Sequence, residues 1–169
     1  MKKLICVACV LLMLLGLTAC KPAEKDTYTI GICQLVQHVA LDAATQGFMD
    51  AVVAELGEEN VTFELQNAAG DSNTCSTIMN TFVSDDVDLI MANATPALQA
   101  AATATADIPI LGTSVTEYGV ALNIENFSGT VGGNISGTSD LAPLDEQAAM
   151  LNELFPDAKN VGLLYCSAE

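Results

Sequence analysis

The sequence predicts an α/β fold built on a parallel, doubly wound sheet. Short β-branched and apolar segments alternate along the chain with longer segments whose apolar residues recur every three or four positions. This alternation is typical of βαβ units, in which a right-handed helical crossover joins neighbouring parallel strands. The chain can also fill a sizeable core, because 51% of its 169 residues are hydrophobic.

The first twenty residues predict a secretory signal. Lys2 and Lys3 precede an apolar run over 4–15, and small residues lead to Cys20. The run is shorter than the ~20 residues of a spanning helix, which disfavours an uncleaved anchor. The ending Leu-Thr-Ala-Cys resembles the bacterial lipobox, which implies cleavage before Cys20 and acylation of Cys20. We therefore expect a lipoprotein signal peptide over 1–19 and a lipid-anchored linker over 20–27, with the protein outside the cytoplasmic membrane.

The first half of the remaining chain predicts two strands, each followed by a helix. Residues 28–33 form a short buried strand, and 38–56 form a helix that ends before Gly57. Residues 61–65 form the second strand. The next helix begins at a cap supplied by Asp71 or Ser72, and its apolar face includes Cys75 and Phe82.

Two further strands and a helix follow. Residues 88–91 and 108–111 predict strands, and 95–104 predict a helix with Thr95 at the N-cap and Pro96 at the first helical position. Residues 113–140 are rich in Gly and Asn, which predicts a loop, a strand and a crossover connection and not another plain βα unit. We expect 28–140 to form one N-terminal lobe.

The last segment predicts the beginning of a second lobe. Residues 143–154 form a helix and 160–165 an apolar strand, in a hinge crossover that we place at 141–169. Parallel strands are normally buried on both faces, so a strand without a covering helix does not complete a domain. We expect most of the second lobe to be missing, which would weaken ligand binding by this chain.

Charge and cysteine usage exclude several functions. The chain has 21 acidic residues against five lysines and no arginine, which excludes nucleic acid binding. Cys33, Cys75 and Cys166 have no metal-like spacing; we interpret them as buried structural thiols, with a disulfide between two of them left open. The acidic group at 85–88 precedes a strand and is interpreted as a solvated turn, so no metal site and no cofactor are expected.

The segments directly after the strands are the candidate binding loops. In an open parallel sheet, ligands bind outside the carboxyl ends of the strands. These segments carry mainly Gln, Asn, Thr and Ser, which suit recognition by hydrogen bonds more than bond-making. Residues 93–96 carry the most weight, since a Thr beside a helix start can hold an anion; the alternative is that Thr95 is only a cap. His38 is the single histidine and no Gly-x-Ser-x-Gly elbow occurs, so no catalytic residue is expected.

Five blocks of sequence carry a family resemblance. They are IGICQLVQH at 30–38 with ALD at 40–42, QNAAGD at 66–71, ATPALQA at 94–100, SVTE at 114–117 and GTSD at 137–140. In this order behind a lipobox, they resemble the substrate-binding lipoproteins of ABC importers in the tryptophan/tyrosine-binding group. That group has the periplasmic-binding-protein type I fold. The resemblance covers 28–169.

The resemblance implies two lobes that close on a small amino acid-like ligand and deliver it to an ABC permease in the membrane. It implies that six residues line the cleft: Gln34, Thr95, Pro96, Thr116, Ser139 and Asp140. It also places 165–169 in the first cleft loop of the second lobe. Val39, Ala69 and the pair Glu117-Tyr118 depart from the family pattern, and the last pair falls in a cleft loop. Tyr118 is the one aromatic residue near the predicted cleft, so an aromatic ligand is left open.

Two other functions remain as alternatives to an importer component. One is a ligand-sensing lipoprotein that acts on a membrane receptor, which a neighbouring permease gene would distinguish. The other is a lipid-anchored hydrolase, which would need a catalytic group such as His38. The leading expectation is a binding protein that performs no chemistry.

Overall fold

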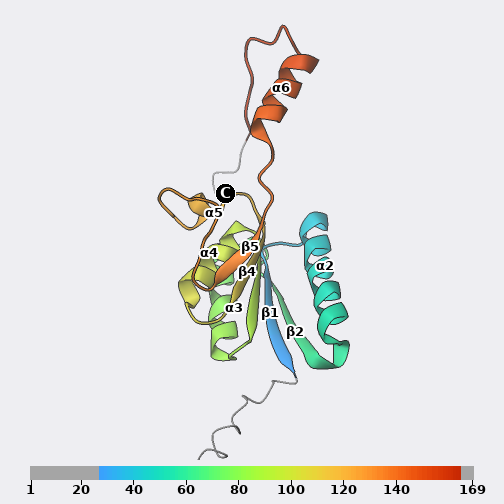
Figure 1. The fold of residues 1–169 in the computed structure, drawn as a ribbon, viewed down its shortest axis with the longest axis vertical. Helices are drawn as coiled ribbons and strands as arrows, with labels where there is room; N and C mark the ends of the chain where they lie inside the picture. The colour runs from blue at the N-terminus through green and yellow to red at the C-terminus, as the bar shows by residue number, and fades with distance from the viewer. Residues whose placement is uncertain (1–26, 165–169) are drawn as a thin grey trace, which may run out of the picture.

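Five parallel strands form one sheet in a computed structural model that describes residues 27–164. The strand order is β2-β1-β3-β4-β5 (Figure 1). The strands are β1 Tyr28–Gln34, β2 Val61–Asn67, β3 Leu89–Asn93, β4 Ile110–Val115 and β5 Ile135–Ser139. This order reverses direction beside β1, as in doubly wound sheets. The predicted parallel α/β fold is confirmed.

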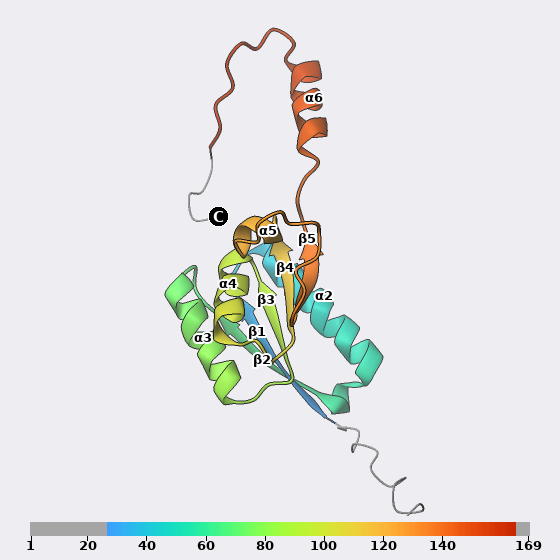
Figure 2. The same ribbon diagram turned by 60° about the vertical axis from the view of Figure 1, so that its left-hand side comes forward.

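Helices cover both faces of the sheet. Helix α2 (Val39–Leu56) lies on one face, and α3 (Ser72–Ser84) and α4 (Thr95–Ala104) lie on the other, as Figure 2 shows. The remaining helical segments are η2 Glu58–Asn60, α5 Tyr118–Ala121 and α6 Leu144–Leu154. His38 caps α2 by accepting a hydrogen bond at Nδ1 from the Ala40 N–H (3.2 Å). Asp71 caps α3 by accepting one from the Asn73 N–H (2.8 Å).

The core has two parts, one on each face of the sheet. Ile30, Ile32 and Met91 pack against the half-buried side chains of α2. The larger part lies beneath α3 and α4 and contains Phe82 and Leu98, both fully buried. Gly31 allows α3 to approach β1 closely, because a Cβ at this position would lie 2.7 Å from the Phe82 ring.

Tyr118 covers the β4–β5 pair on the α4 side. Its ring is 5% exposed, and its hydroxyl donates to the Thr138 carbonyl at 3.2 Å. Cβ atoms at Gly112 or Gly137 would collide with this hydroxyl. The two glycines therefore make room for the tyrosine, and the β4–β5 register shifts between Gly112 and Val115.

The structure corrects three local predictions. Residues 160–164 form no strand, since a parallel strand needs a neighbour and none of the described residues pairs with them. The strand predicted at 108–111 begins at Ile110 and continues to Val115. Thr95 is not the N-cap of α4, because Ala94 occupies that position with φ 96° and Thr95 is the first helical residue.

The segment after β5 extends away from the sheet. Helix α6 stands apart from the five strands in Figures 1 and 2 and buries none of its residues. None of the helices in 27–164 is long and apolar enough to cross a membrane. The predicted signal peptide, Cys20 and residues 165–169 lie outside the described residues.

Candidate functional site

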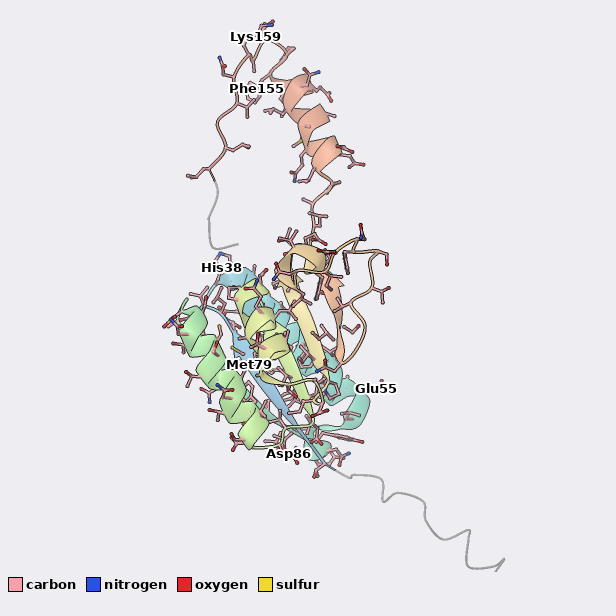
Figure 3. All side chains as sticks on the ribbon, turned by 90° about the vertical axis from the view of Figure 1, so that its left-hand side faces the viewer. His38, Glu55, Met79, Asp86, Phe155 and Lys159 are labelled. Carbon is pink, nitrogen blue, oxygen red and sulfur yellow. The ribbon has the colours of Figure 1, made fainter. Side chains whose placement is uncertain are left out.

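The carboxyl ends of all five strands meet at one edge of the sheet, which we call the carboxyl edge. It comprises the last residue of each strand and the loop that follows it. Gln34 is in register with Asn93, Asn93 with Thr113, and Val115 with Ser139. His38 marks this edge in Figure 3, and Asp86 marks the opposite edge. The loops of neighbouring strands therefore form one continuous surface.

Gln34 is fixed in place by three hydrogen bonds within the lobe. Its Nε2 donates to the Val36 carbonyl (2.9 Å) and to Asp42 Oδ1 (2.6 Å), and its Oε1 accepts from the Thr45 hydroxyl (2.7 Å). The side chain is only 4% exposed. It ties the end of β1 to α2 and sets the path of the loop between them.

Asn93 continues this network into the centre of the sheet. Its Nδ2 donates to the Thr45 hydroxyl (2.9 Å) and to the Leu41 carbonyl (2.9 Å). The residue is fully buried, and its Oδ1 has no hydrogen-bond partner in the structure. We use the name amide network for Gln34, Thr45 and Asn93, which lock β1, β3 and α2 together beneath the carboxyl edge.

Thr95 and Pro96 lie at the start of α4, directly after β3. Thr95 is half-buried and Pro96 is buried. The first intrahelical bond of the main chain is from the Leu98 N–H to the Ala94 carbonyl (3.1 Å). N–H groups in a first helical turn lack intrahelical acceptors and carry positive partial charge, which suits an anionic group such as a carboxylate.

Thr116, Ser139 and Asp140 lie together where β4 and β5 end. The Ser139 hydroxyl donates to the Thr116 carbonyl (2.7 Å), and the Asp140 N–H donates to the Val115 carbonyl (3.1 Å). All three residues are exposed. The Ser139 hydroxyl ties the ends of β4 and β5 together, and the three residues remain open to solvent.

The structure brings the six predicted residues to one edge, in two groups with different exposure. Thr116, Ser139 and Asp140 are exposed, whereas Gln34 and Pro96 are buried and Thr95 is half-buried. Sequence reasoning missed Thr45, although a hydroxyl among the inward apolar residues of α2 was a usable signal. It also placed Tyr118 near the cleft, but the Tyr118 ring is buried against β4 and β5.

The site contains little positive charge. Lys159 is the one lysine within residues 27–164, and Figure 3 shows it beyond α6, away from His38. A bound carboxylate would therefore rely on main-chain N–H groups and hydroxyls. Burial and the nearby Asp140 carboxylate raise the pKa of Tyr118, so this hydroxyl stays protonated. Among the described residues, no cluster of His, Cys, Asp and Glu could hold a metal ion.

Two cavities adjoin the carboxyl edge. One of about 340 Å³ lies between α2 and β2 and is lined by Gln34, Asp42, Thr45 and Asn67 among others. The second, of about 590 Å³, lies between β5 and the glycine-rich loop that precedes it, and Ser139 and Glu117 contribute to its wall. The Glu117 carboxylate caps α5 by accepting hydrogen bonds from the Gly119 and Val120 N–H groups.

A family model described as "ABC transporter substrate binding protein" matches residues 29–169. The chain belongs to the ABC transporter substrate-binding protein family. A tyrosine-binding protein from Clostridioides difficile (strain R20291) is 41% identical to this substrate-binding protein over 154 residues. The match covers 88% of this chain and 44% of the relative. The chain thus spans less than half the length of this curated relative.

Solved structures support the same assignment. The ligand-free, open structure of a substrate-binding protein with adhesive properties from Clostridium difficile is 41% identical, with a TM-score of 0.69. A Streptococcus pneumoniae ABC domain in complex with L-Trp is 33% identical, with a TM-score of 0.77. Each match covers 85% of this chain and about half of the other, 49% and 48%. The described sheet therefore corresponds to one lobe of a periplasmic-binding-protein type I fold.

Proposed function

We propose that this chain forms the N-terminal ligand-binding lobe of an extracytoplasmic lipoprotein that captures an amino acid for an ABC permease. Cys20 would carry the lipid anchor, and residues 141–169 would cross the hinge into a second lobe. The observation that carries the proposal is the hydrogen-bonding carboxyl edge, which has no lysine or arginine and is held rigid by the amide network. The similarity to a tyrosine-binding protein and to a domain bound to L-Trp supports an aromatic amino acid as the ligand.

The proposed binding mode uses fixed donors and lobe closure. The first turn of α4, with Thr95 and Pro96, receives the ligand carboxylate. The exposed group of Thr116, Ser139 and Asp140 lies at the ends of the next two strands, β4 and β5, and Asp140 offers a charge for the ligand ammonium. Gln34 acts from beneath by holding the first loop in place. Closure of a second lobe then excludes water and strengthens each of these contacts.

A thermal-shift screen tests this function directly. Residues 20–169, joined to the second-lobe half of the C. difficile tyrosine-binding relative, would be heated with each of the twenty amino acids. A ligand at 100 times its dissociation constant adds about 2.7 kcal/mol of stability, so a clear rise in Tm identifies it. We expect tyrosine or tryptophan to give the largest rise and Thr116→Val with Ser139→Ala to remove most of it.

Incubation of the hybrid with the amino acids, and co-purification of the lipidated chain, separate the proposed function from its alternatives. Amino acid recovered unchanged after long incubation supports a binding protein, whereas released product indicates a hydrolase. Co-purification of the lipidated chain with a permease and ATPase supports an importer. Co-purification with a membrane receptor supports a sensor. A folded hybrid that responds to none of the amino acids would contradict the proposed ligand class.

A further inference from the structure

Two buried cysteines face each other across the β1–α3 contact. The close approach of Gly31 and Phe82 fixes how α3 lies on β1. Cys33 is two residues further along β1, on the same face of the strand. Cys75 is seven residues before Phe82, two helical turns away on the same face of α3. Helix α3 starts at the carboxyl edge and runs antiparallel to β1. The step from Gly31 to Cys33 and the step from Phe82 to Cys75 therefore both lead toward the carboxyl edge, which brings the two cysteines together.

The side chains confirm this juxtaposition. The Cys33 and Cys75 thiols interact with each other, and both residues are fully buried in the same core cluster. Both are free thiols in the structure. Within residues 27–164, they share no cluster with His, Asp or Glu that could hold a metal ion.

We propose that Cys33 and Cys75 form a disulfide bond that is made while the lobe folds outside the cytoplasm. Each thiol loses its proton, one thiolate attacks a disulfide-bearing oxidant such as oxidised glutathione or an oxidoreductase, and the second thiolate displaces the reduced carrier. Two protons and two electrons leave the cysteine pair, and the oxidant's disulfide is reduced to two thiols. The bond links the first strand to the helix after the second strand.

Burial of the two thiols explains why the disulfide would form during folding and not after the lobe has folded. The thiolate is the reactive form, and a buried apolar setting disfavours it. Burial, together with the adjacent Cys75, raises the pKa of Cys33, and burial also raises the pKa of Cys75. In the folded lobe both thiols are protonated and out of reach of an oxidant. A partly folded chain, with α3 not yet docked, exposes both.

The supply of oxidant rests on the proposed extracytoplasmic location, because disulfides persist mainly in oxidising compartments. The geometry of the cysteine pair does not depend on where the protein is located. A refolding experiment that supplies its own oxidant therefore tests the cysteine pair independently of the proposed function. If no amino acid raised the Tm but the disulfide formed, the proposed ligand class would be contradicted and the disulfide proposal would be supported.

The test has two arms, both on the full chain. In the first, reduced and denatured chain is refolded in a glutathione redox buffer. In the second, the chain is isolated from bacteria that export it, with free thiols blocked at lysis. Free thiols receive one alkylating label, and thiols released by reduction receive another. Digestion must use a Glu-specific protease, since no lysine or arginine lies between Lys25 and Lys159 and trypsin would leave both cysteines in one peptide.

We expect the released-thiol label on Cys33 and Cys75 in both arms, and a Glu-C peptide pair joined by a disulfide before reduction. The oxidised chain should melt higher than the reduced chain, on the order of 5 °C or more. Cys75→Ala should leave Cys33 as a free thiol and abolish the effect of reductant on Tm. Cys166→Ser should change neither label.

Three results would overturn the proposal. Free thiols at both positions after refolding would show that the pair cannot reach bonding geometry. Linkage of Cys33 or Cys75 to another cysteine would assign a different partner. A bond that forms in the refolding buffer but is absent from the exported protein would show that the cell does not make it.

Discussion

The Thr45 hydroxyl donates a hydrogen bond of 2.7 Å to Gln34 Oε1, and both side chains are 4% exposed. The same hydroxyl accepts from Asn93 Nδ2 at 2.9 Å. One small side chain on α2 therefore satisfies polar groups at the ends of two neighbouring strands. A buried polar group without a hydrogen-bond partner lowers the stability of the folded state, whereas a fully paired network makes the surrounding structure rigid. This relationship holds the ends of β1 and β3 in a fixed arrangement beneath the carboxyl edge.

Replacing Thr45 by valine should destabilise the lobe. The change keeps the side-chain shape but leaves Gln34 Oε1 without its donor, which costs about 1–3 kcal/mol. Urea unfolding followed by far-UV circular dichroism measures this. Thr77→Val is the matched control, because its exposed hydroxyl bonds only to the Asn73 carbonyl and its loss should cost less than about 0.5 kcal/mol. Equal losses in the two variants would contradict the role of the amide network.

Ala94 should tolerate glycine and reject a β-branched residue. Its backbone has φ 96° and ψ 157°, a region that side chains rarely adopt. Ala94→Val should cost about 2 kcal/mol or more, while Ala94→Gly should stay within about 1 kcal/mol of the parent because relieved strain offsets the lost methyl group. Ala102→Val, in the last turn of α4, controls for helix propensity. Similar urea midpoints for the two valine variants would refute the strain at Ala94.

Gly112→Ala should be destabilising because Tyr118 occupies the space that the new methyl group needs. The cost should be about 1–3 kcal/mol, and Tyr118→Phe should recover part of it by removing the colliding hydroxyl. Gly47→Ala is the control, since nothing lies within 4 Å of a Cβ there and α2 should gain roughly 0.5–1 kcal/mol. A double-mutant cycle with no coupling between positions 112 and 118 would speak against this packing.

Under reducing conditions, stability should fall at alkaline pH because of the buried thiols. The folded-state pKa of Cys33 lies above its ordinary value of 9.0, so the folded state resists ionisation. The resulting stability is complete below about pH 9 and declines as the pH rises further, since only the unfolded chain ionises readily. Urea midpoints between pH 7 and 10.5 should fall more steeply for the parent than for Cys33→Ala. Parallel curves would argue against the buried thiol.

Local sequence patterns were sufficient for most of the fold. The apolar strands and the spacing of α2, α3 and α4 are local signals, and the parallel order follows from the helical crossovers. The position of Thr95 was harder to predict, because Thr is a common N-cap and nothing local shows that Ala94 adopts a positive φ. The strand predicted at 160–165 failed within the described residues, because strand formation depends on a neighbour that local pattern does not supply.

The edge that carries the candidate site was predictable from the sequence, whereas its internal contacts were not. The rule that ligands bind at the carboxyl ends of strands pointed to the loops at this edge, and the family resemblance selected the six residues within them. The internal partners of Gln34, however, depend on how α2 packs on β1 and β3, which is a tertiary contact. Tyr118 likewise turns into the lobe because two glycines 25 residues apart come together on β4 and β5. Local sequence cannot reveal such a pairing.

The central claim is that the carboxyl edge binds an amino acid, and an NMR titration tests it most directly. A ¹⁵N-labelled chain starting after Cys20 would be titrated with tyrosine and tryptophan, which detects even the weak binding expected from a single lobe. We predict saturable shifts at the amides of Thr95, Ala97, Thr116 and Asp140, weakened about tenfold by Thr116→Val, with Asp86 at the opposite edge unchanged. Shifts confined to the opposite edge, or no shifts with either tyrosine or tryptophan, would contradict the account.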